Sequence, residues 1–363
     1  MKKTLFFIFL CLSAKVSSAQ LHQDVFPDLE GQPLLDALES SYKPAFTLGN
    51  SAAKDTLYAV IYHLPGDSLR AVYTAYTIHL PQGEDPSQAA FARDVNLEHT
   101  YPKSKGAAGG PQESDMHHLF PTRVEVNADR GSLPFGESPD DQTTNWYYQA
   151  TEQSTIPASQ INAWSELLEN VLFEPREDHK GNVARAMFYF YTMYHEAADQ
   201  IDDTYFENQR ETLCLWHYLD PVDQKEWDRT FLIAQYQDDK PNPFVLDCTL
   251  AKRTYCADVD MSCLTANENL NVPEFFSWKG LYPNPVHGQL SWHFSLSEPA
   301  KLRFELLDPY GKPVALLMEK QLSAGSYEQT ADLSNLPPGF YLLQLRLWGK
   351  RESQAHWKVL VFR

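Results

Sequence analysis

Residues 94–137 constrain the fold of this 363-residue chain more strongly than any other stretch. Residues 92–102, ARDVNLEHTYP, overlap the start of this stretch. Their side chains alternate as those of a strand do, and Pro102 is expected to end that strand. A glycine-rich loop follows. Pro121 suits the first turn of a helix and Gly131 its C-terminal stop, which predicts a helix over residues 122–130. The stretch therefore predicts a strand, a loop and a helix that form one unit.

Two neighbours on the predicted strand, Glu98 and His99, carry chemistry that phosphodiester hydrolysis requires. That reaction needs a deprotonated water and a cation that bears charge on the phosphoryl and leaving oxygens. The carboxylate of Glu98 and the amide oxygen of Asn127 are the hard ligands that Mg²⁺ prefers. His99, with an ordinary pKa near ~6.5, is a candidate general base at neutral pH. The stretch is thus a candidate nuclease centre.

The spacing of this pair sets a geometric condition. Adjacent residues of a strand point to opposite faces, so Glu98 and His99 face one pocket only if the backbone twists or bulges between Leu97 and Thr100. We expect such a distortion at the end of the strand, just before Pro102.

The predicted helix adds two arginines. Arg123, Asn127 and Arg130 stand four and three residues apart, so they are expected to share one helix face. An arginine there could grip the scissile phosphate. For Arg130 an alternative stays open, namely a cation favoured by the helix dipole and paired with Asp129 or Glu125.

A second cluster precedes the helix. Asp115 and His117 are either direct metal ligands or a supporting pair that orients His99 or buttresses the loop. Considered from the residues alone, a zinc site built from Glu98, His99, His117 and His118 competes with the magnesium site.

The first residues predict export. Lys2 and Lys3 precede an apolar run, and small residues lead up to Ala19, as a signal peptidase requires. The apolar run of residues 5–12 is far shorter than the ~20 residues a bilayer requires. We therefore interpret residues 1–19 as a removed signal peptide, with a membrane anchor or a lipid on Cys11 as the alternatives. No later stretch is apolar enough to span a membrane.

Four cysteines remain after the predicted signal: Cys214, Cys248, Cys256 and Cys263. An even number in an oxidising compartment favours disulfides, with three possible pairings. Zinc is the competing interpretation, but the spacing contains no C-x-x-C pair.

The formal net charge of −18 limits the kind of nucleic-acid protein this chain can be. Phosphate binding draws on Lys and Arg, so the acidic balance argues against tight, sequence-reading DNA binding. It leaves room for an enzyme that needs only transient contact, because a divalent cation supplies positive charge where the phosphate sits.

Elsewhere the chain divides into two parts. Residues 33–41 predict a short helix, and residues 56–80 predict two strands, the first half also being compatible with a helix. Four stretches with helical spacing of apolar residues predict a helical layer over the site: residues 160–173, 182–199, 210–220 and 224–237.

From Leu281 onward, short alternating runs separated by turn signals predict a small all-β, immunoglobulin-like sandwich. The predicted fold class is α+β. Residues 20–263 form the catalytic domain, residues 264–280 a linker and residues 281–363 the sandwich.

The motifs LEHTYPKS and ESDMHHLFPTRVEVNADRGSLPFGE resemble the bacterial endonuclease I family, periplasmic or secreted nucleases with a ββα-metal fold. NVARAMFYFYTMY, LWHYLDPVDQKEWDR and NPFVLD resemble its helical portion, so the likeness covers about residues 30–260. The resemblance implies that His99 is the general base and that Glu98 and Asn127 hold one Mg²⁺, for which Mn²⁺ or Ca²⁺ are possible substitutes. It also implies cleavage of DNA, and often RNA, with little sequence preference.

The chain departs from this family pattern at two points. Some relatives carry a phosphate-binding arginine in the loop after the Glu-His pair, where this chain has only Lys103 and Lys105 as cations. Lys103, Arg123 and Arg130 are therefore the candidate phosphate contacts. Gly131 is followed by Ser132 where many members have Asn, which we expect to affect packing more than chemistry.

The C-terminal motifs LYPNPVHGQL, LLDPYGKPV and LSNLPPGFYLLQL resemble the type A sorting domain of the type IX secretion system. This resemblance implies passage through the periplasm and then across the outer membrane, with the type IX machinery as a partner.

Together these features predict a secreted or cell-surface, Mg²⁺-dependent, nonspecific endonuclease that acts as a monomer on DNA, with RNA as a second candidate substrate. One alternative is a non-catalytic nucleic-acid or surface-binding protein that retains the fold. Another is an RNA-only or zinc-dependent phosphoesterase.

Overall fold

The computed structural model describes residues 21–259, 261, 263, 273, 275–284, 286, 288–307, 312–337, 339–348 and 352–361. The predicted signal peptide and most of the predicted linker lie outside these residues. Within the described part, no helix is both long enough and apolar enough to cross a membrane.

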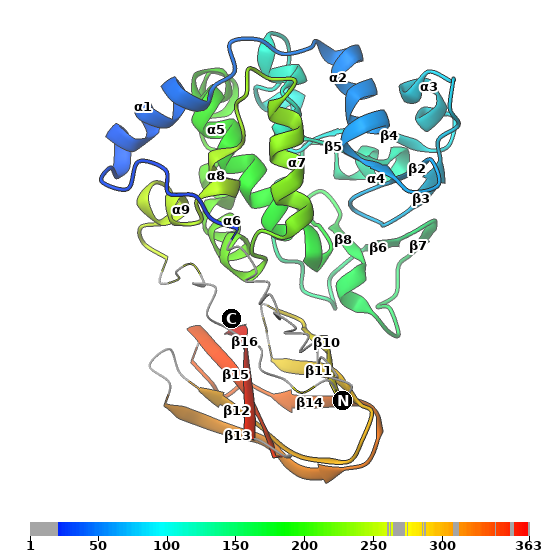
Figure 1. Ribbon diagram of the computed structural model, residues 1–363, viewed down its shortest axis with the longest axis vertical. Coiled ribbons are helices and arrows are strands. Elements are labelled where there is room, and N and C mark those ends of the chain that lie inside the picture. Colours follow the sequence, from blue (N-terminus) through cyan, green and yellow to red (C-terminus); the bar gives the residue numbers. More distant parts are fainter. Residues whose placement is uncertain are drawn as a thin grey trace, which may run out of the picture.

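The N-terminal part, shown from blue to yellow-green in Figure 1, mixes helices with short sheets. Its helices are α1 (Gly31–Tyr42), α2 (Asn50–Thr56), α3 (Pro86–Phe91), α4 (Val124–Arg130), α5 (Lys180–Asp202), α6 (Glu207–Leu219), α7 (Gln224–Ala234), α8 (Pro243–Leu246) and α9 (Thr249–Arg253). Its strands are β1 (His63–Leu64), β2 (Ser68–Arg70), β3 (Thr77–His79), β4 (Val95–His99), β5 (Leu119–Arg123), β6 (Asn145–Tyr148), β7 (Thr151–Gln153), β8 (Ser165–Leu168) and β9 (Leu172–Glu174).

The central unit is a two-stranded antiparallel sheet followed at once by a helix. β4 pairs with β5 in a regular register from Val95↔Arg123 to His99↔Leu119, and α4 begins at the next residue. The helix predicted over residues 122–130 is present but begins two residues later, at Val124, because Pro121 and the two residues after it belong to β5. All five residues of β5 are buried, so burial against β4 and the segment before β3 outweighs the preference of proline for a first helical turn. The predicted stop is confirmed, because Gly131 has a φ of +53° and donates its N–H to Asn127 O.

Two further expectations concern the segments around this unit. Residues 56–80 are helical as far as Ile61 and then form the small sheet β1-β2-β3. The prediction of a helix over residues 160–173 is wrong, since β8 and β9 lie there in a sheet of order β7-β6-β8-β9. A turn in which Asn170 takes a positive φ of 59° joins these two strands and interrupts the helical spacing.

A helical layer lies against the central unit, as predicted. α5 packs on the turn at residues 116–118, where the rings of Tyr189 and His117 lie 4.8 Å apart and those of Phe190 and His118 lie 4.7 Å apart. α1, α5, α6 and α7 confirm the helices predicted at residues 33–41, 182–199, 210–220 and 224–237.

The C-terminal part is an all-β sandwich, drawn from yellow to red in Figure 1. One sheet has the order β10 (Phe276–Tyr282), β11 (Gln289–Leu296), β14 (Gly325–Asp332). The other has the order β13 (Pro313–Leu322), β12 (Ala300–Leu307), β15 (Gly339–Trp348), β16 (Glu352–Val361). Buried side chains such as Trp292, Phe304 and Leu345 fill the space between the sheets. The α+β class is confirmed, and β10 begins inside the range predicted as linker.

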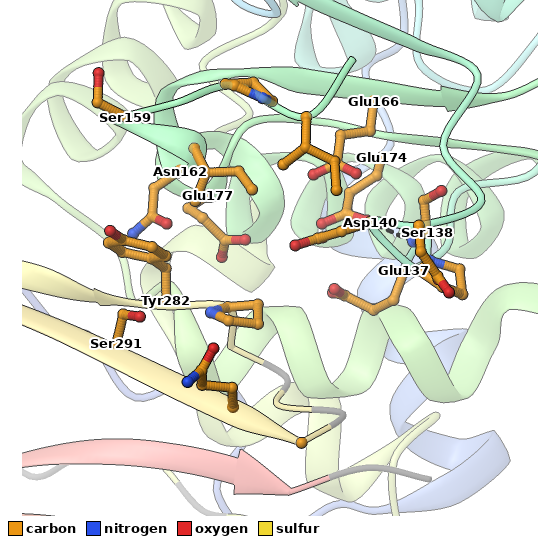
Figure 2. Close-up of a pocket in the computed structure, with 18 of the residues that line it drawn as sticks. Glu137, Ser138, Asp140, Ser159, Asn162, Glu166, Glu174, Glu177, Tyr282 and Ser291 are labelled. Atoms are coloured by element: carbon orange, nitrogen blue, oxygen red, sulfur yellow. Dashed lines mark hydrogen bonds between the residues drawn. The ribbon is translucent and has the colours of Figure 1, made fainter. Parts of the chain in front are cut away.

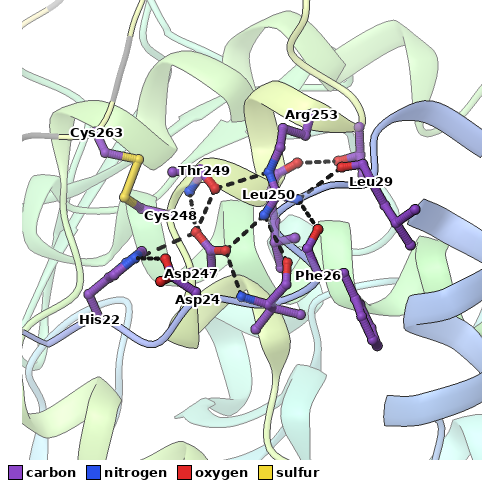
Figure 3. Close-up of polar contacts among 12 residues, drawn as sticks. His22, Asp24, Phe26, Leu29, Asp247, Cys248, Thr249, Leu250, Arg253 and Cys263 are labelled. Carbon is purple, nitrogen blue, oxygen red and sulfur yellow. Dashed lines mark hydrogen bonds and ion pairs between the residues drawn. A yellow bond between two sulfur atoms is a disulfide. The ribbon is translucent and has the colours of Figure 1, made fainter. Parts of the chain in front are cut away.

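The cysteines pair as Cys214–Cys256 and Cys248–Cys263, which confirms disulfides over zinc. The second bridge lies beside a polar clasp, shown in Figure 3, that joins the two ends of the N-terminal part. Arg253 donates to the carbonyls of Val25, Phe26 and Leu29 at 2.7–2.9 Å and pairs with Asp247 at 2.8 Å.

Candidate active site

Glu98 lies on the face of β4 that meets α4. Its side chain is buried, and its Oε1 accepts a hydrogen bond from the Tyr73 hydroxyl at 2.8 Å. The same oxygen lies 3.3 Å from Arg130 Nη1. Burial raises the pKa of Glu98, while the charge of Arg130 and the tyrosine bond act in the opposite direction.

Asn127, on α4, lies on the same side of β4 as Glu98. Its Nδ2 donates to Asn96 Oδ1 at 2.9 Å and to Leu97 O at 3.1 Å. Asn96 is two residues from Glu98, so the two side chains share one strand face. With its NH₂ group occupied by β4, Asn127 keeps Oδ1 as its acceptor atom, and no donor among the described residues bonds to it.

His99 takes the other face of the strand. Its Nε2 bonds to Glu113 O at 2.9 Å, and its ring lies edge-on to His118 at 5.6 Å. Because a carbonyl accepts, Nε2 carries the proton and Nδ1 is the basic atom of the neutral ring. Burial, with a smaller effect of His118, lowers the pKa of His99 to about 3, so the ring is neutral at pH 7.

The expected distortion between Leu97 and Thr100 is absent from the β4–β5 ladder. The register runs without a shift from Val95 to His99. Regular alternation therefore places the carboxylate and the imidazole on the two faces of the strand, at its C-terminal end.

Arg130 lies beneath the strand end and is fully buried. Its guanidinium donates to His99 O at 3.2 Å and Thr100 O at 2.8 Å, and it stacks 4.5 Å from the centre of the Phe135 ring. The predicted role of Arg130 was to contact a phosphate. In the structure its guanidinium is instead enclosed by backbone carbonyls and Glu98, so it is not accessible to a nucleic acid.

The other predicted phosphate contacts lie at opposite ends of the β4–β5 pair. Arg123 is the last residue of β5, not part of the helix, and pairs with Asp94 at 2.8 Å and Glu125 at 3.0 Å. The prediction that it shares a helix face with Asn127 and Arg130 is therefore wrong. Lys103 is half exposed and pairs with Glu113 at 2.9 Å, and its charge contributes to lowering the pKa of His99.

Asp115 anchors the segment before β5 to the helical layer. Its fully buried carboxylate accepts from Tyr189, Tyr194 and Gln237, each at 2.8 Å. His117 bonds through Nε2 to Lys240 O at 2.8 Å.

His118 bonds through Nε2 to Gln112 O at 2.8 Å. His99, His117 and His118 are thus held by three different carbonyls. The structure does not bring them together with Glu98 as a zinc site.

The Glu98 and Asn127 oxygens fit one hard divalent cation. One oxygen of the carboxylate is occupied by Tyr73 and Arg130, and the amide nitrogen is occupied by β4, which leaves one oxygen on each side chain for a cation. No group of three or more His, Cys, Asp and Glu side chains in the described part of the chain is arranged to hold a metal. A site of one carboxylate and one amide is completed by water and substrate oxygens.

A large cavity lies away from these residues, between the N-terminal part and the sandwich. Figure 2 shows its lining, which includes Glu137, Asp140, Glu166, Glu174 and Glu177, and its volume is about 620 Å³. Lys180 Nζ neutralises part of this charge by pairing with three glutamates at 2.7–2.9 Å. This lining contains no lysine or arginine among the described residues, so it lacks the cations on which phosphate binding draws.

Sequence reasoning missed Tyr73, Asn96 and the carbonyl of Glu113. Asn96 could have been found, because it alternates with Glu98 on one strand. Tyr73 is 25 residues from Glu98 in a segment with no chemical motif, and only the tertiary fold brings them together.

Each of the two parts of the chain matches a known protein family. The Endonuclease I family model matches residues 50–248, and that of the secretion system C-terminal sorting domain matches residues 280–357. The sorting domain marks the chain as a secreted or cell-surface protein.

The extracellular ribonuclease of Bacillus subtilis (strain 168) is 31% identical over 166 residues, which are 42% of this chain and 51% of the relative. The extracellular ribonuclease of Bacillus amyloliquefaciens is 32% identical over 166 residues, 42% of this chain and 50% of the relative. The chain thus spans about half the length of these curated relatives.

Among solved structures, dimeric latent PorU from Porphyromonas gingivalis is 18% identical and aligns with 25% of this chain and 9% of its own, with a TM-score of 0.22 that supports no argument. The family match carries the conclusion. It spans more than half of the chain and contains Glu98, His99 and Asn127, and the chain belongs to the endonuclease I family.

Proposed function

We propose that this protein is a secreted, divalent-metal-dependent endonuclease that hydrolyses phosphodiester bonds of DNA and RNA with little sequence preference. The observation that carries the proposal is the end of β4, where a carboxylate and amide pair lies on one face and a neutral imidazole on the other. In-line displacement has the attacking and leaving oxygens on opposite sides of the phosphorus, which suits such an arrangement.

Glu98 and Asn127 are the residues that would hold the cation, with Mg²⁺ as our first candidate and Mn²⁺ or Ca²⁺ as substitutes. When bound, the cation supplies positive charge to the phosphoryl group and to the 3′ leaving oxygen. Family members are generally divalent-metal dependent, and both side chains offer the oxygen donors that Mg²⁺ prefers.

His99 takes the proton of the attacking water at Nδ1. The bond from Nε2 to Glu113 O fixes the tautomer and the ring plane, and it leaves Nδ1 as the unprotonated nitrogen that can accept a proton. Lys103, beside Glu113, is our candidate contact for the substrate phosphate. The guanidinium of Arg130 instead positions the strand end by holding the carbonyls of His99 and Thr100.

The acceptance of RNA is supported by the relatives, which are named extracellular ribonucleases. A net charge of −18 supports transient rather than tight binding, since few cations are available to neutralise phosphates. We further propose that the protein acts as a monomer, and that the type IX secretion machinery recognises its sorting domain and exports it through the periplasm.

Digestion of supercoiled plasmid and of a folded RNA by the purified protein tests this function. We expect both to be nicked and fragmented with Mg²⁺, no cleavage with EDTA, and recovery when Mg²⁺ is restored. RNA cleavage without DNA cleavage would reduce the proposal to a ribonuclease. Zn²⁺ as the only effective cation would favour the zinc alternative, and binding of both substrates without cleavage in any metal would favour a non-catalytic protein.

A further inference from the structure

Tyr73 lies between β2 and β3, far in sequence from the other site residues. Its side chain is fully buried. The neighbouring Val72 N–H donates to Pro121 O on β5 at 2.9 Å, and the Tyr73 carbonyl accepts from Ser165 Oγ on β8 at 2.7 Å. The backbone of Tyr73 is therefore held from two sheets at once.

The ring of Tyr73 is equally constrained. Its centroid lies 4.9 Å from that of Phe173 and 5.8 Å from that of His179. Tyrosine has only two side-chain torsions to fix, so this packing determines where the hydroxyl points. The hydroxyl lies 2.8 Å from Glu98 Oε1 and donates its hydrogen bond to that oxygen.

The hydroxyl of Tyr73 restricts the orientation of the Glu98 carboxylate. Oε1 is shared between the Tyr73 hydroxyl and Arg130 Nη1, at 2.8 and 3.3 Å. A carboxylate held at one oxygen by two donors cannot rotate freely, so the position of the other oxygen, Oε2, is restricted as well. Arg130 also bonds to backbone carbonyls, whereas the side chain of Tyr73 makes its hydrogen bond to Glu98.

We propose that Tyr73 is a positioning residue that sets the orientation of Glu98 for the divalent cation, an inference that rests on the proposed function. It acts through Glu98 and touches neither substrate nor cation. A group that orients a metal ligand in this way typically changes metal affinity by roughly 10- to 100-fold when it is removed.

Direct Mn²⁺ binding to the full mature chain, followed by the electron paramagnetic resonance signal of free Mn²⁺, tests the proposal. Tyr73→Phe removes only the hydroxyl and keeps the ring in its packing. Tyr58→Phe is the matched control, because Tyr58 is also fully buried but its hydroxyl has no hydrogen-bond partner among the described residues. Glu98→Gln reports on the cation site itself.

We expect Tyr73→Phe to bind Mn²⁺ roughly 10- to 100-fold more weakly, with the wild-type stoichiometry, and Tyr58→Phe to bind as the wild type does. Cleavage by Tyr73→Phe should recover at high Mn²⁺ concentration, so that the metal requirement changes and the saturated rate does not. A folding defect would instead lower the stoichiometry and the saturated rate.

Two results would overturn the proposal, and they are distinguishable. Wild-type Mn²⁺ affinity in Tyr73→Phe, with affinity lost in Glu98→Gln, would exclude the role of Tyr73 and leave the proposed function in place. Wild-type affinity in Glu98→Gln, or no Mn²⁺ binding by the unsubstituted protein, would remove the cation site and with it both proposals.

Discussion

Glu98 and His99 are adjacent in the sequence but have different surroundings. Glu98 contacts Tyr73 and Arg130 on the side of β4 that faces α4, whereas His99 contacts Glu113 and His118 on the opposite side. A regular strand achieves this separation without backbone strain. The sequence analysis required both side chains to face one pocket; in the structure the candidate site instead surrounds the end of a strand.

Arg130 gives a prediction that separates a positioning role from a phosphate contact. Arg130→Ala removes the guanidinium that pairs with the buried carboxylate of Glu98. It also removes the donor to the backbone carbonyls of His99 and Thr100. We expect the free energy of unfolding, measured with urea, to fall by about 3–5 kcal/mol.

Arg123→Ala is the comparison for Arg130→Ala, because its partners Asp94 and Glu125 have side chains that are 41% and 51% exposed and can be solvated. It should cost less stability than Arg130→Ala. Wild-type stability of Arg130→Ala together with a raised KM for DNA would instead support the phosphate contact.

At the scale of elements, the loop after β4 packs closely against α5 at Gly106. Gly106 has a φ of +120°, and a Cβ there would lie 2.6 Å from the Ala198 Cα and 2.7 Å from the Ala197 carbonyl oxygen on α5. No side chain fits without moving the loop that carries Lys103 or the helix behind it.

We expect Gly106→Ala to destabilise the protein by more than the about 1–2 kcal/mol that a left-handed conformation alone costs. Gly109→Ala isolates that backbone cost, because Gly109 has a φ of +70° and a Cβ there would meet nothing within 4 Å. Thermal unfolding of both variants makes the comparison. Equal shifts for the two variants would show that the contact with α5 does not constrain the loop.

The success of sequence prediction also varied by element. The long amphipathic helices α5, α6 and α7 were predictable, because each repeats its apolar spacing over several turns. β8 and β9 were not, because strands of four and three residues are too short to show a period of two. Pro121 lies in a strand and not in a helix, because the stabilisation from burying β5 outweighs the local preference of proline for the first turn of a helix.

The candidate site was predictable only where a motif spans it. Glu98, His99 and Asn127 lie within one stretch, and their residue types indicate the chemistry. Tyr73 comes from a different segment, and its role depends on which sheets pack together. The roles predicted for Arg130 and Arg123 rested on helix spacing and on the absence of an arginine from the loop after the Glu-His pair. Neither feature shows whether a side chain is buried or already paired.

On the scale of the whole molecule, buried titratable groups should limit stability at both ends of the pH range. Burial lowers the pKa of His117 and His118 to about 4, so the stability from their neutral forms is present above about pH 6.5 and is lost as the pH falls. Burial and neighbouring charges raise the pKa of Glu174 to about 8. Its contribution is complete below its unfolded pKa near 4.5 and is lost as the pH rises through about 8.

Glu174→Gln should therefore flatten the alkaline side of this profile. We expect the free energy of unfolding of the wild type to fall between pH 5.5 and pH 8.5, by at most about 1.4 kcal/mol per pH unit for one group. The variant should lose less over the same interval, because an amide does not titrate. Urea unfolding at several pH values provides the measurement, and identical slopes for the two proteins would contradict the assignment.

The central claim is that His99 activates water in a metal-dependent nuclease, and the most direct test is the single-turnover cleavage rate of His99→Ala at saturating Mg²⁺. Thermal unfolding and Mn²⁺ binding should show that the variant keeps its fold and its cation site. General-base catalysis contributes typically 10²–10⁴-fold, so we predict a rate lower by about that factor. A rate equal to that of the wild type would contradict the account.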